Sequence, residues 1–350
     1  MFWGKFQFLA WNKVNSATMT LPPRKVAVAP MLDWTDRHCR FFHRQITRYT
    51  WLYTEMVTTG ALMYGDVARH LDFNETEHPV ALQLGGSEPA DLAHCAKLGE
   101  KWGYDEINLN CGCPSERVQK GAFGACLMKE SSLVSDCVKA MRDAVSVDVT
   151  VKHRIGIDAG MSYDFVRDFI GDISLAGCRI FIVHARNAVL KGLSPKENRE
   201  IPPLRYEIVY RLKQDFPGLE IILNGGITAA AEVDAHLKHV DGVMIGRAAY
   251  HTPYLMADFD ARYYQDGGLP KSRKAILQAM IPYMENQLAL YGKASGGGLK
   301  LHSMTRHMLG LMAGEPGARR FRQILSDSKR LAADDPRLLM EAINAVAALS

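Results

Sequence analysis

The sequence predicts a TIM (β/α)8 barrel followed by a smaller, all-helical domain. Three observations lead to this fold class. Short β-branched or apolar runs alternate with amphipathic stretches, polar or glycine residues close nearly every run, and the chain becomes helical in character after Asp266. Strands that alternate with helices indicate βαβ units and a parallel sheet, and eight such units over about 240 residues match a TIM barrel.

The predicted strands and helices follow one another along the first 250 residues. The eight strands are Lys25–Met31, Trp51–Val57, Pro79–Gly86, Glu106–Pro114, Asp148–Gly156, Arg179–Arg186, Glu220–Ile227 and Gly242–Tyr250. The amphipathic stretches between them include Asp91–Trp102, Ser132–Val145, Tyr163–Ala176, Leu204–Phe216 and Ala229–Val240. An open doubly wound sheet is the alternative, and the lack of a Gly-x-Gly-x-x-Gly turn disfavours it.

Polar side chains gather at one end of the predicted strands. They are Gln83, Asn108, Asn110, Lys152, Arg154, His184, Arg186, Asn224 and Arg247, all at carboxyl ends. A buried structural role could explain any one of them but explains poorly why all fall at the same strand end. Because barrel enzymes build their sites at this face, we expect the active site there.

Three segments divide the chain. Residues 1–20 form an expected disordered leader without the continuous apolar core of a signal peptide. The barrel domain occupies residues 21–267, and a helical domain occupies residues 268–350. Gly267–Pro270 reads as the linker, and Gly296–Gly298 breaks the first two helical patterns. Those patterns are Arg273–Tyr291, Lys300–Met312, Arg319–Leu331 and Pro336–Leu349.

Composition and charge narrow the setting and the partners. No stretch approaches the ~20 apolar residues of a membrane span, and seven cysteines without a Cys-x-x-Cys pair disfavour disulfides and structural zinc. We therefore expect a cytoplasmic protein without a metal. Residues 268–350 hold 12 Lys and Arg against 6 Asp and Glu, a net charge of +6, so the overall +4 leaves −2 for residues 1–267. A basic appendage on a mildly acidic core indicates a polyanionic partner, although a basic solvated helical surface is the alternative.

Two strand ends are suited to a phosphate group. Asn224–Gly225–Gly226 closes the seventh strand and Gly246–Arg247 closes the eighth. Glycines allow backbone N–H groups to approach phosphate oxygens, the helix beginning near Thr228 adds its positive end, and Arg247 supplies a charge-assisted contact. Phosphate binding by the loops after strands seven and eight is recurrent in TIM barrels.

Other strand ends are suited to a flavin. A flavin needs a cation or donor near its N1–C2 carbonyl edge and an amide partner for its pyrimidine edge. Lys152 and Gln83 supply these groups, and His184 lies on the neighbouring strand. Pro30 and Met31 end the first predicted strand, and with Leu32, which follows it, they complete the predicted cofactor site.

The most specific segment is Ile107–Ser115, with the sequence Ile-Asn-Leu-Asn-Cys-Gly-Cys-Pro-Ser. Cys113, held by the proline that follows it, could act as nucleophile, ligand or general acid. A cysteine thiol is protonated at neutral pH and can deliver its proton. For Cys111 we favour packing over chemistry. The other cysteines, Cys39, Cys95, Cys126, Cys137 and Cys178, are predicted to be inert packing residues.

With these motifs the chain resembles the tRNA-dihydrouridine synthases from Ala29 to the late helices. The shared marks are Ala29–Met31, Asn108–Ser115, Gly121–Ala125, Lys152–Gly156, His184–Arg186, Asn224–Ile227 and Ile245–Arg247. The segment Asn198–Leu204 is similar to the A-type subgroup, and this resemblance implies action at positions 20 and 20a of the tRNA D-loop.

The resemblance implies a two-stage reaction. NADPH reduces FMN, and hydride then passes from flavin N5 to C6 of uracil while Cys113 protonates C5. Hydride addition develops an enolate-like charge that needs a nearby acid. Asn110 is expected to hydrogen-bond the uracil, with Lys152, Arg154 and His184 lining the same cavity. The base must leave the D-loop stack to be reached.

We expect the protein to be a monomer that binds the D-loop and elbow of tRNA. The RNA contacts are predicted in two regions of the chain. The loop after strand six supplies Arg186, Lys191, Lys196 and Arg199. The helical domain supplies Arg306, Arg319, Arg320 and Arg322. Arg319 and Arg322, three positions apart, share one helical face.

Two other functions remain open from the sequence. A flavin barrel acting on a free pyrimidine, like the dihydroorotate dehydrogenases, would leave the basic helical domain unexplained. A non-catalytic tRNA-binding protein with a relic barrel is disfavoured by the intact Cys113, Lys152 and both glycine turns.

Overall fold

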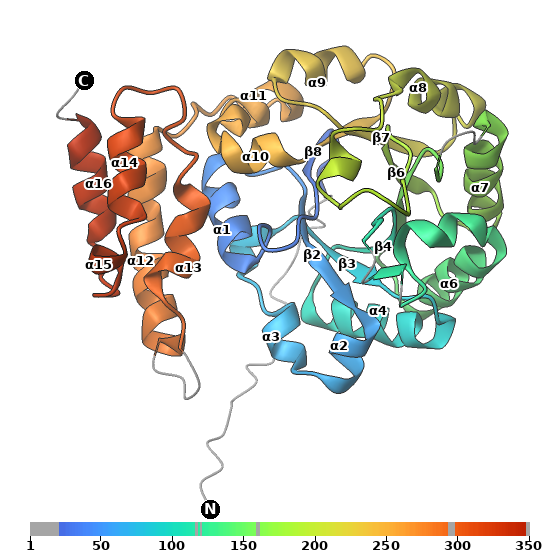
Figure 1. Cartoon of the computed structure of the whole chain (residues 1–350), viewed down its shortest axis with the longest axis horizontal. Coiled ribbons are helices and arrows are strands. Elements are labelled where there is room, and N and C mark those ends of the chain that lie inside the picture. The colour runs from blue at the N-terminus through green and yellow to red at the C-terminus, as the bar shows by residue number, and fades with distance from the viewer. Residues whose placement is uncertain (1–20, 116–117, 120, 159–161, 293–297, 348–350) are drawn as a thin grey trace, which may run out of the picture.

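The computed structural model describes residues 21–115, 118–119, 121–158, 162–292 and 298–347 (Figure 1). The predicted leader, the last residues of the predicted final helix and two of the three glycines in Gly296–Gly298 lie outside the described residues.

Eight parallel strands form the barrel, which confirms the predicted fold class. They pair in the order β1-β8-β7-β6-β5-β4-β3-β2. The ring closes between β1 and β2, where the Val28 N–H donates to the Trp51 carbonyl at 2.8 Å and the Trp51 N–H donates to the Val26 carbonyl at 3.0 Å. The strands are β1 (Val26–Val28), β2 (Leu52–Thr58), β3 (Val80–Gly85), β4 (Glu106–Cys111), β5 (Asp148–Arg154), β6 (Ile180–His184), β7 (Glu220–Asn224) and β8 (Gly242–Ile245).

Helices surround the strands and continue beyond them (Figure 1). Around the barrel these are α1 (Arg37–Ile46), α2 (Thr59–Tyr64), α3 (Val67–Leu71), α4 (Pro89–Trp102), α6 (Ser131–Ala144), α7 (Tyr163–Leu175), α8 (Tyr206–Asp215), α9 (Ala230–His236), α10 (Arg247–His251) and α11 (Phe259–Tyr264). The C-terminal region contains α12 (Arg273–Tyr291), α13 (Leu301–Thr305), α14 (Ala318–Leu325), α15 (Ser328–Leu331) and α16 (Leu338–Ala347).

Several predicted boundaries were wrong. The predicted eighth strand ran to Tyr250, but β8 ends at Ile245 and α10 begins at Arg247, because Gly246 turns the chain. The predicted helix Arg319–Leu331 is two helices. Asp327 accepts hydrogen bonds from the N–H groups of Lys329 and Arg330 and so starts α15 anew. The predicted helix Lys300–Met312 is likewise shorter, with α13 followed by a 3-10 turn.

The strands have two different faces. On β4, Ile107, Leu109 and Cys111 belong to the apolar layer between the strands and the outer helices, whereas Glu106, Asn108 and Asn110 alternate with them on the other face. Successive side chains of a strand point to opposite faces. The barrel interior is therefore polar along β4, and this face leads to the Cys113 turn.

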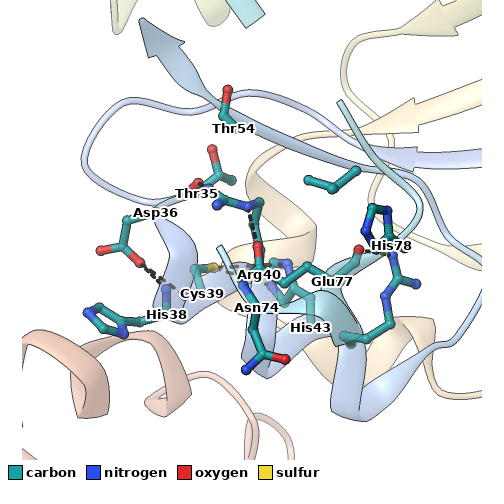
Figure 2. Close-up of polar contacts among 12 residues, drawn as sticks. Thr35, Asp36, His38, Cys39, Arg40, His43, Thr54, Asn74, Glu77 and His78 are labelled. Atoms are coloured by element: carbon teal, nitrogen blue, oxygen red, sulfur yellow. Dashed lines mark hydrogen bonds and ion pairs between the residues drawn. The ribbon is translucent and has the colours of Figure 1, made fainter. Parts of the chain in front are cut away.

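The C-terminal helices pack beside α1 (Figure 1). Asp36, just before α1, joins the two parts. Asp36 Oδ1 accepts from the N–H groups of His38 and Cys39 at 3.0 Å and caps α1. Its Oδ2 accepts from Arg306 Nη2 at 2.8 Å and contacts His307 Nε2 at 3.0 Å. Figure 2 shows the Asp36 end of this network and His38 at the side of α1 next to the C-terminal helices.

Aromatic contacts extend the same joint. His38 Nδ1 lies 2.8 Å from the Tyr283 hydroxyl, and Tyr283 stacks on Phe41 with ring centroids 3.8 Å apart. Burial lowers the pKa of His38 to about 4, so this imidazole is neutral at pH 7. Further along, Tyr291 contacts Arg37 through its ring, with 4.6 Å from the guanidinium carbon to the ring centroid. The joint thus combines charged and apolar contacts along one side of α1.

Candidate active site

The turn that carries Cys113 follows β4 at the carboxyl end of the barrel. Cys113 is half-buried, whereas Cys111 is fully buried in the outer apolar layer. Burial raises the pKa of the Cys111 thiol well above its ordinary value. Of the two thiols, Cys113 alone is open to a ligand at the barrel mouth.

Two side chains, Asn110 and Arg154, form hydrogen bonds with the backbone of this turn. Asn110 Oδ1 accepts from the N–H groups of Gly112 and Cys113 at 3.0 Å each. Arg154 Nε donates to the Gly112 carbonyl at 3.0 Å, and its Nη1 donates to the carbonyls of Asn187 and Asn198 at 3.0 and 2.9 Å. The turn is fixed by its own strand and by β5 together.

The Asn110 amide continues into the barrel interior through two more amides. Asn110 Nδ2 donates to Gln83 Oε1 at 2.8 Å, and Gln83 Nε2 donates to Asn108 Oδ1 at 2.7 Å. Gln83 and Asn108 are register partners on β3 and β4. Asn110 and Gln83, predicted as substrate and cofactor contacts, are thus also bonded to each other.

Below these amides the connection reaches a buried carboxylate. Asn108 Nδ2 donates to Thr150 Oγ1 at 2.7 Å, and the Thr150 hydroxyl donates to Glu106 Oε1 at 2.6 Å. Glu106 also accepts from the Tyr53 hydroxyl and from Arg24 Nε, each at 2.7 Å. We call the set Asn110, Gln83, Asn108, Thr150 and Glu106 the polar ladder.

Lys152 is a buried cation near the carboxyl end of β5. Its Nζ donates to Asn224 Oδ1 at 3.2 Å, and Asn224 Nδ2 donates to the Met244 carbonyl at 2.7 Å. Burial, with the positive charge of Arg154, lowers the pKa of Lys152 to about 7, while the thiol of Cys113 acts in the opposite direction. No carboxylate of the described residues contributes to this shift, so an anionic ligand would supply the missing charge.

His184 and the glycine turn after β7 lie side by side. A Cβ atom on Gly225 would come within 2.9 Å of the His184 ring, and the φ of Gly225 is +126°. Burial, then the charges of Arg154 and Lys152, lowers the pKa of His184 well below its ordinary value. The imidazole is therefore neutral. Gly225 brings the backbone close to it as no larger residue could.

The loop after β6 covers the other edge of the mouth. Asn198 is buried and organises this loop, since its Oδ1 accepts from the Val189 N–H at 2.8 Å and its Nδ2 donates to the Val189 carbonyl at 2.9 Å. Arg247 Nη1 donates to Glu200 Oε1 at 2.6 Å, which ties the predicted phosphate arginine to the same loop. A Cβ atom on Gly246 would meet open space.

The remaining predicted cofactor residues lie at the end of β1 and β7. Pro30 and Met31 are half-buried, Leu32 is 66% exposed, and Gly226 is exposed. The Met31 N–H donates to Thr35 Oγ1 at 2.9 Å, which holds this loop above the barrel.

The predicted RNA contacts fall into two groups. Arg154, Arg186 and Arg306 have partners within the protein: Arg186 Nη1 donates to the carbonyls of Glu200 and Pro202, and Arg306 pairs with Asp36. The others are exposed and form no ion pair among the residues that the structure describes. They are Lys191, Lys196, Arg199, Arg319, Arg320 and Arg322.

Sequence reasoning missed three residues of this site. Thr150 and Glu106 lie too deep to be read as strand-end residues, and Asn198 looked only like a subgroup mark. One signal was available for the first two: Glu106, Asn108 and Asn110 recur at every second position of an otherwise apolar strand. Such alternation in a buried strand predicts a polar interior face.

Neither a metal site nor a membrane-spanning helix is found among the described residues. Across the described ranges, no group of three or more His, Cys, Asp or Glu side chains could hold a metal ion. Over the same ranges, no helix has the length and apolar character needed to cross a membrane.

The fold and this site define a barrel enzyme whose mouth places a half-exposed thiol among cations. Comparison with known proteins gives the family. The chain belongs to the dihydrouridine synthase family, whose model matches residues 27–347. It is 57% identical to the tRNA-dihydrouridine(20/20a) synthase of Pseudomonas aeruginosa, over 93% of this chain and 96% of that protein. It is 56% identical to the protein of the same name from Escherichia coli K12, over 92% of each chain.

A solved structure shares the fold at low identity. The complex of 2-naphthoyl-CoA reductase with 2-naphthoyl-CoA matches with a TM-score of 0.51 and 10% identity. The match covers 67% of this chain and 49% of that chain. At this identity the likeness concerns the fold alone.

Proposed function

We propose that this protein reduces uridines 20 and 20a in the D-loop of tRNA to dihydrouridine, with FMN as cofactor and NADPH as reductant. The observation that carries the proposal is the position of Cys113. Its thiol is half-exposed at the barrel mouth, and Lys152, Arg154 and Arg199 lie near enough to interact with it electrostatically. The names of the relatives supply the substrate and the two positions.

The residues of the mouth fit an anionic flavin nucleotide. Lys152 has a single hydrogen bond among the described residues and a pKa lowered to about 7 by burial and by Arg154, so it lacks a counter-charge. The residues that would hold FMN are Pro30, Met31, Leu32, Gln83, Lys152, His184, Asn224, Gly225, Gly226, Gly246 and Arg247. When bound, the reduced flavin supplies hydride to C6 of uracil.

Cys113 completes the reduction by giving its proton to C5. Hydride addition places negative charge on the pyrimidine, and the thiol proton neutralises it. The sulfur is left as a thiolate, which the nearby charges of Lys152 and Arg154 stabilise until solvent returns a proton. The turn bonds from Asn110 and Arg154 hold the donor in one place during this transfer.

The substrate is held by cations outside the mouth. We assign residues 268–350 as the tRNA-binding domain, with Arg319 and Arg322 on α14 and with Lys196 and Arg199 in the loop after β6. These side chains are exposed, and phosphate contacts supply most of the sequence-independent affinity for RNA. The flipped base then enters the mouth beside Cys113.

The test replaces the proton donor. Cys113→Ala is expected to retain bound flavin and its reduction by NADPH, and to lose nearly all dihydrouridine formation in tRNA. Cys111→Ala is the matched control, because it removes a thiol that is buried in the outer layer. Wild-type rates of uridine reduction in Cys113→Ala would remove the acid role, and a wild-type protein that leaves tRNA uridine unreduced would refute the proposed function.

A further inference from the structure

The polar ladder runs from the barrel interior to the backbone of the Cys113 turn. Its five side chains come from β3, β4 and β5, and Gln83, Asn108, Thr150 and Glu106 are almost completely buried. Each neighbouring pair is joined by one hydrogen bond of 2.6–2.8 Å. The last member, Asn110, accepts from the N–H groups of Gly112 and Cys113.

The groups at the two ends of the polar ladder fix the orientation of the amide and hydroxyl groups between them. The backbone N–H groups can only donate, and the Glu106 carboxylate accepts from Thr150, Tyr53 and Arg24. Asn110 must therefore present its oxygen to the turn and its NH2 to Gln83. Gln83 and Asn108 must then orient their amides in the same sense, each accepting with its oxygen and donating with its NH2 to the next member. Reversing one amide would set donor against donor on one side and acceptor against acceptor on the other.

Aligned bonds of this kind strengthen one another in a buried setting. Donation to the carboxylate polarises the Thr150 hydroxyl, which makes its oxygen a better acceptor for the Asn108 amide. Arg24 keeps Glu106 paired, with Nε 2.7 Å from Oε2. The far end of the ladder is therefore anchored by an ion pair within the barrel.

We propose that Glu106, Thr150 and Asn108 are positioning residues for the proton donor. They act through Gln83 and Asn110 to set the position of the Cys113 turn relative to the substrate. This inference rests on the proposed function, because it assigns to Cys113 the proton transfer to uracil. Thr150 is the link to break, because it touches neither the turn nor a proposed cofactor residue directly.

The test removes the Thr150 hydroxyl and keeps the shape of the side chain. In Thr150→Val the Asn108 NH2 loses its acceptor and Glu106 loses one donor. Single-turnover reduction of tRNA uridine by the pre-reduced enzyme is expected to slow roughly tenfold to a hundredfold, because a misplacement on the order of 1 Å can cost about that much. Thr150→Ser, which keeps the hydroxyl, is expected to restore the rate.

Two controls separate positioning from general damage. Thr50→Val removes another buried, hydrogen-bonded hydroxyl, 2.9 Å from Thr47 Oγ1 and outside the ladder. The rate of iodoacetamide alkylation, measured on flavin-free protein by peptide mass spectrometry, reports on the turn itself. Cys113 in Thr150→Val is expected to react several-fold faster, while the half-buried Cys126 keeps its rate.

Each outcome decides the proposal. An unchanged uridine step, equal slowing in Thr50→Val, or an alkylation rate of Cys113 that does not move would overturn it. Loss of flavin together with activity would also overturn it, because the ladder would then serve Gln83 and the cofactor. If Thr150→Val does not fold, Thr150→Cys keeps a weak donor and must show the same changes in smaller measure. Failure of the wild-type protein to reduce tRNA uridine would refute the proposed function instead.

Discussion

The joint between barrel and C-terminal helices depends on the Asp36 carboxylate, and Asp36→Asn tests it. Asparagine caps helices about as well as aspartate, so the bonds from His38 and Cys39 can persist. The variant loses the charge that Arg306 and His307 meet at 2.8 and 3.0 Å. Asp36→Asn therefore weakens the contacts between the barrel and the C-terminal helices while it keeps the cap of α1.

The expected loss of stability follows from the burial of the two partners of Asp36, Arg306 and His307. Hydrogen bonds to charged groups contribute about 1.5–3 kcal/mol, and a buried donor left without an acceptor costs about 1–3 kcal/mol. The Arg306 side chain is 33% exposed, which places its bond at the lower end, whereas the His307 side chain is fully buried. We expect Asp36→Asn to lower the free energy of unfolding by about 2–4 kcal/mol at pH 7.

The assay is urea unfolding of wild type, Asp36→Asn, Arg306→Met and the double variant. A coupling energy of about 1 kcal/mol or more between the two sites is expected, because residues in direct contact are not additive. Asp66→Asn is the matched control. Asp66 caps α3 through the Arg69 N–H and has no ion-pair partner in the described part of the chain. Additive effects, or an equal loss in Asp66→Asn, would refute the reasoning.

The pH dependence supplies an independent check. Burial acts to raise the pKa of Asp36, but the hydrogen bond and charge of His307 outweigh it, and the folded-state pKa lies below its ordinary value. Stability from this group is therefore present above the unfolded pKa of about 4 and is lost as the pH falls below it. The difference between wild type and Asp36→Asn should shrink on acidification.

Three further predictions concern the cofactor and the RNA. Arg247→Ala, or Gly225→Val, should yield folded but flavin-poor protein. The loss of about 1.5–3 kcal/mol for the arginine corresponds to roughly tenfold to a hundredfold weaker FMN binding by titration; unchanged affinity would place the phosphate elsewhere. Replacing Arg319 and Arg322 together by alanine should reduce the salt slope of tRNA binding by about 0.7–0.9 per lost contact, and a wild-type slope would reject this helical face. Because the pKa of Lys152 is lowered to about 7, flavin-free protein should bind FMN more weakly as the pH rises through this value, and Lys152→Met should lack the trend.

The fold could be predicted because its signals are local. Alternation of apolar runs with amphipathic stretches identified all eight strands, and closure of the ring follows from the number of βα units. The ends of elements were harder. Gly246 marks the point where β8 gives way to α10, but the apolar and small residues before and after Gly246–Arg247 made the whole segment Gly242–Tyr250 look like one strand. Likewise, the Asp327 cap reads as one more polar residue in an amphipathic pattern.

From the sequence, only those residues of the site could be predicted that the topology of the barrel brings together. Parallel strands place their carboxyl ends at one face, so Lys152, His184 and Asn224 had to meet there. The hydrogen-bond partners of the arginines could not be predicted. Arg154 bonds to a carbonyl 42 positions away and Arg306 pairs with an aspartate 270 positions away. The sequence shows which residues carry a guanidinium group, but it does not show which distant oxygen atom accepts the hydrogen bond from that group.

The presence or absence of a carboxylate partner separates the cations of the C-terminal helices that we propose to contact RNA from the others. Five of them lie in ion pairs: Arg273 pairs with Glu315, Lys300 with Asp334, Arg306 with Asp36, Arg330 with Glu341 and Arg337 with Asp335. A cation already paired must give up its partner before it can bind a phosphate, which lowers the net gain of the new contact by about the 0–1 kcal/mol that an exposed ion pair contributes. On α14, by contrast, Arg319, Arg320 and Arg322 are exposed and form no ion pair with any described residue. Because α14 carries three such guanidinium groups within four positions, we propose that this helix is where RNA contacts the region.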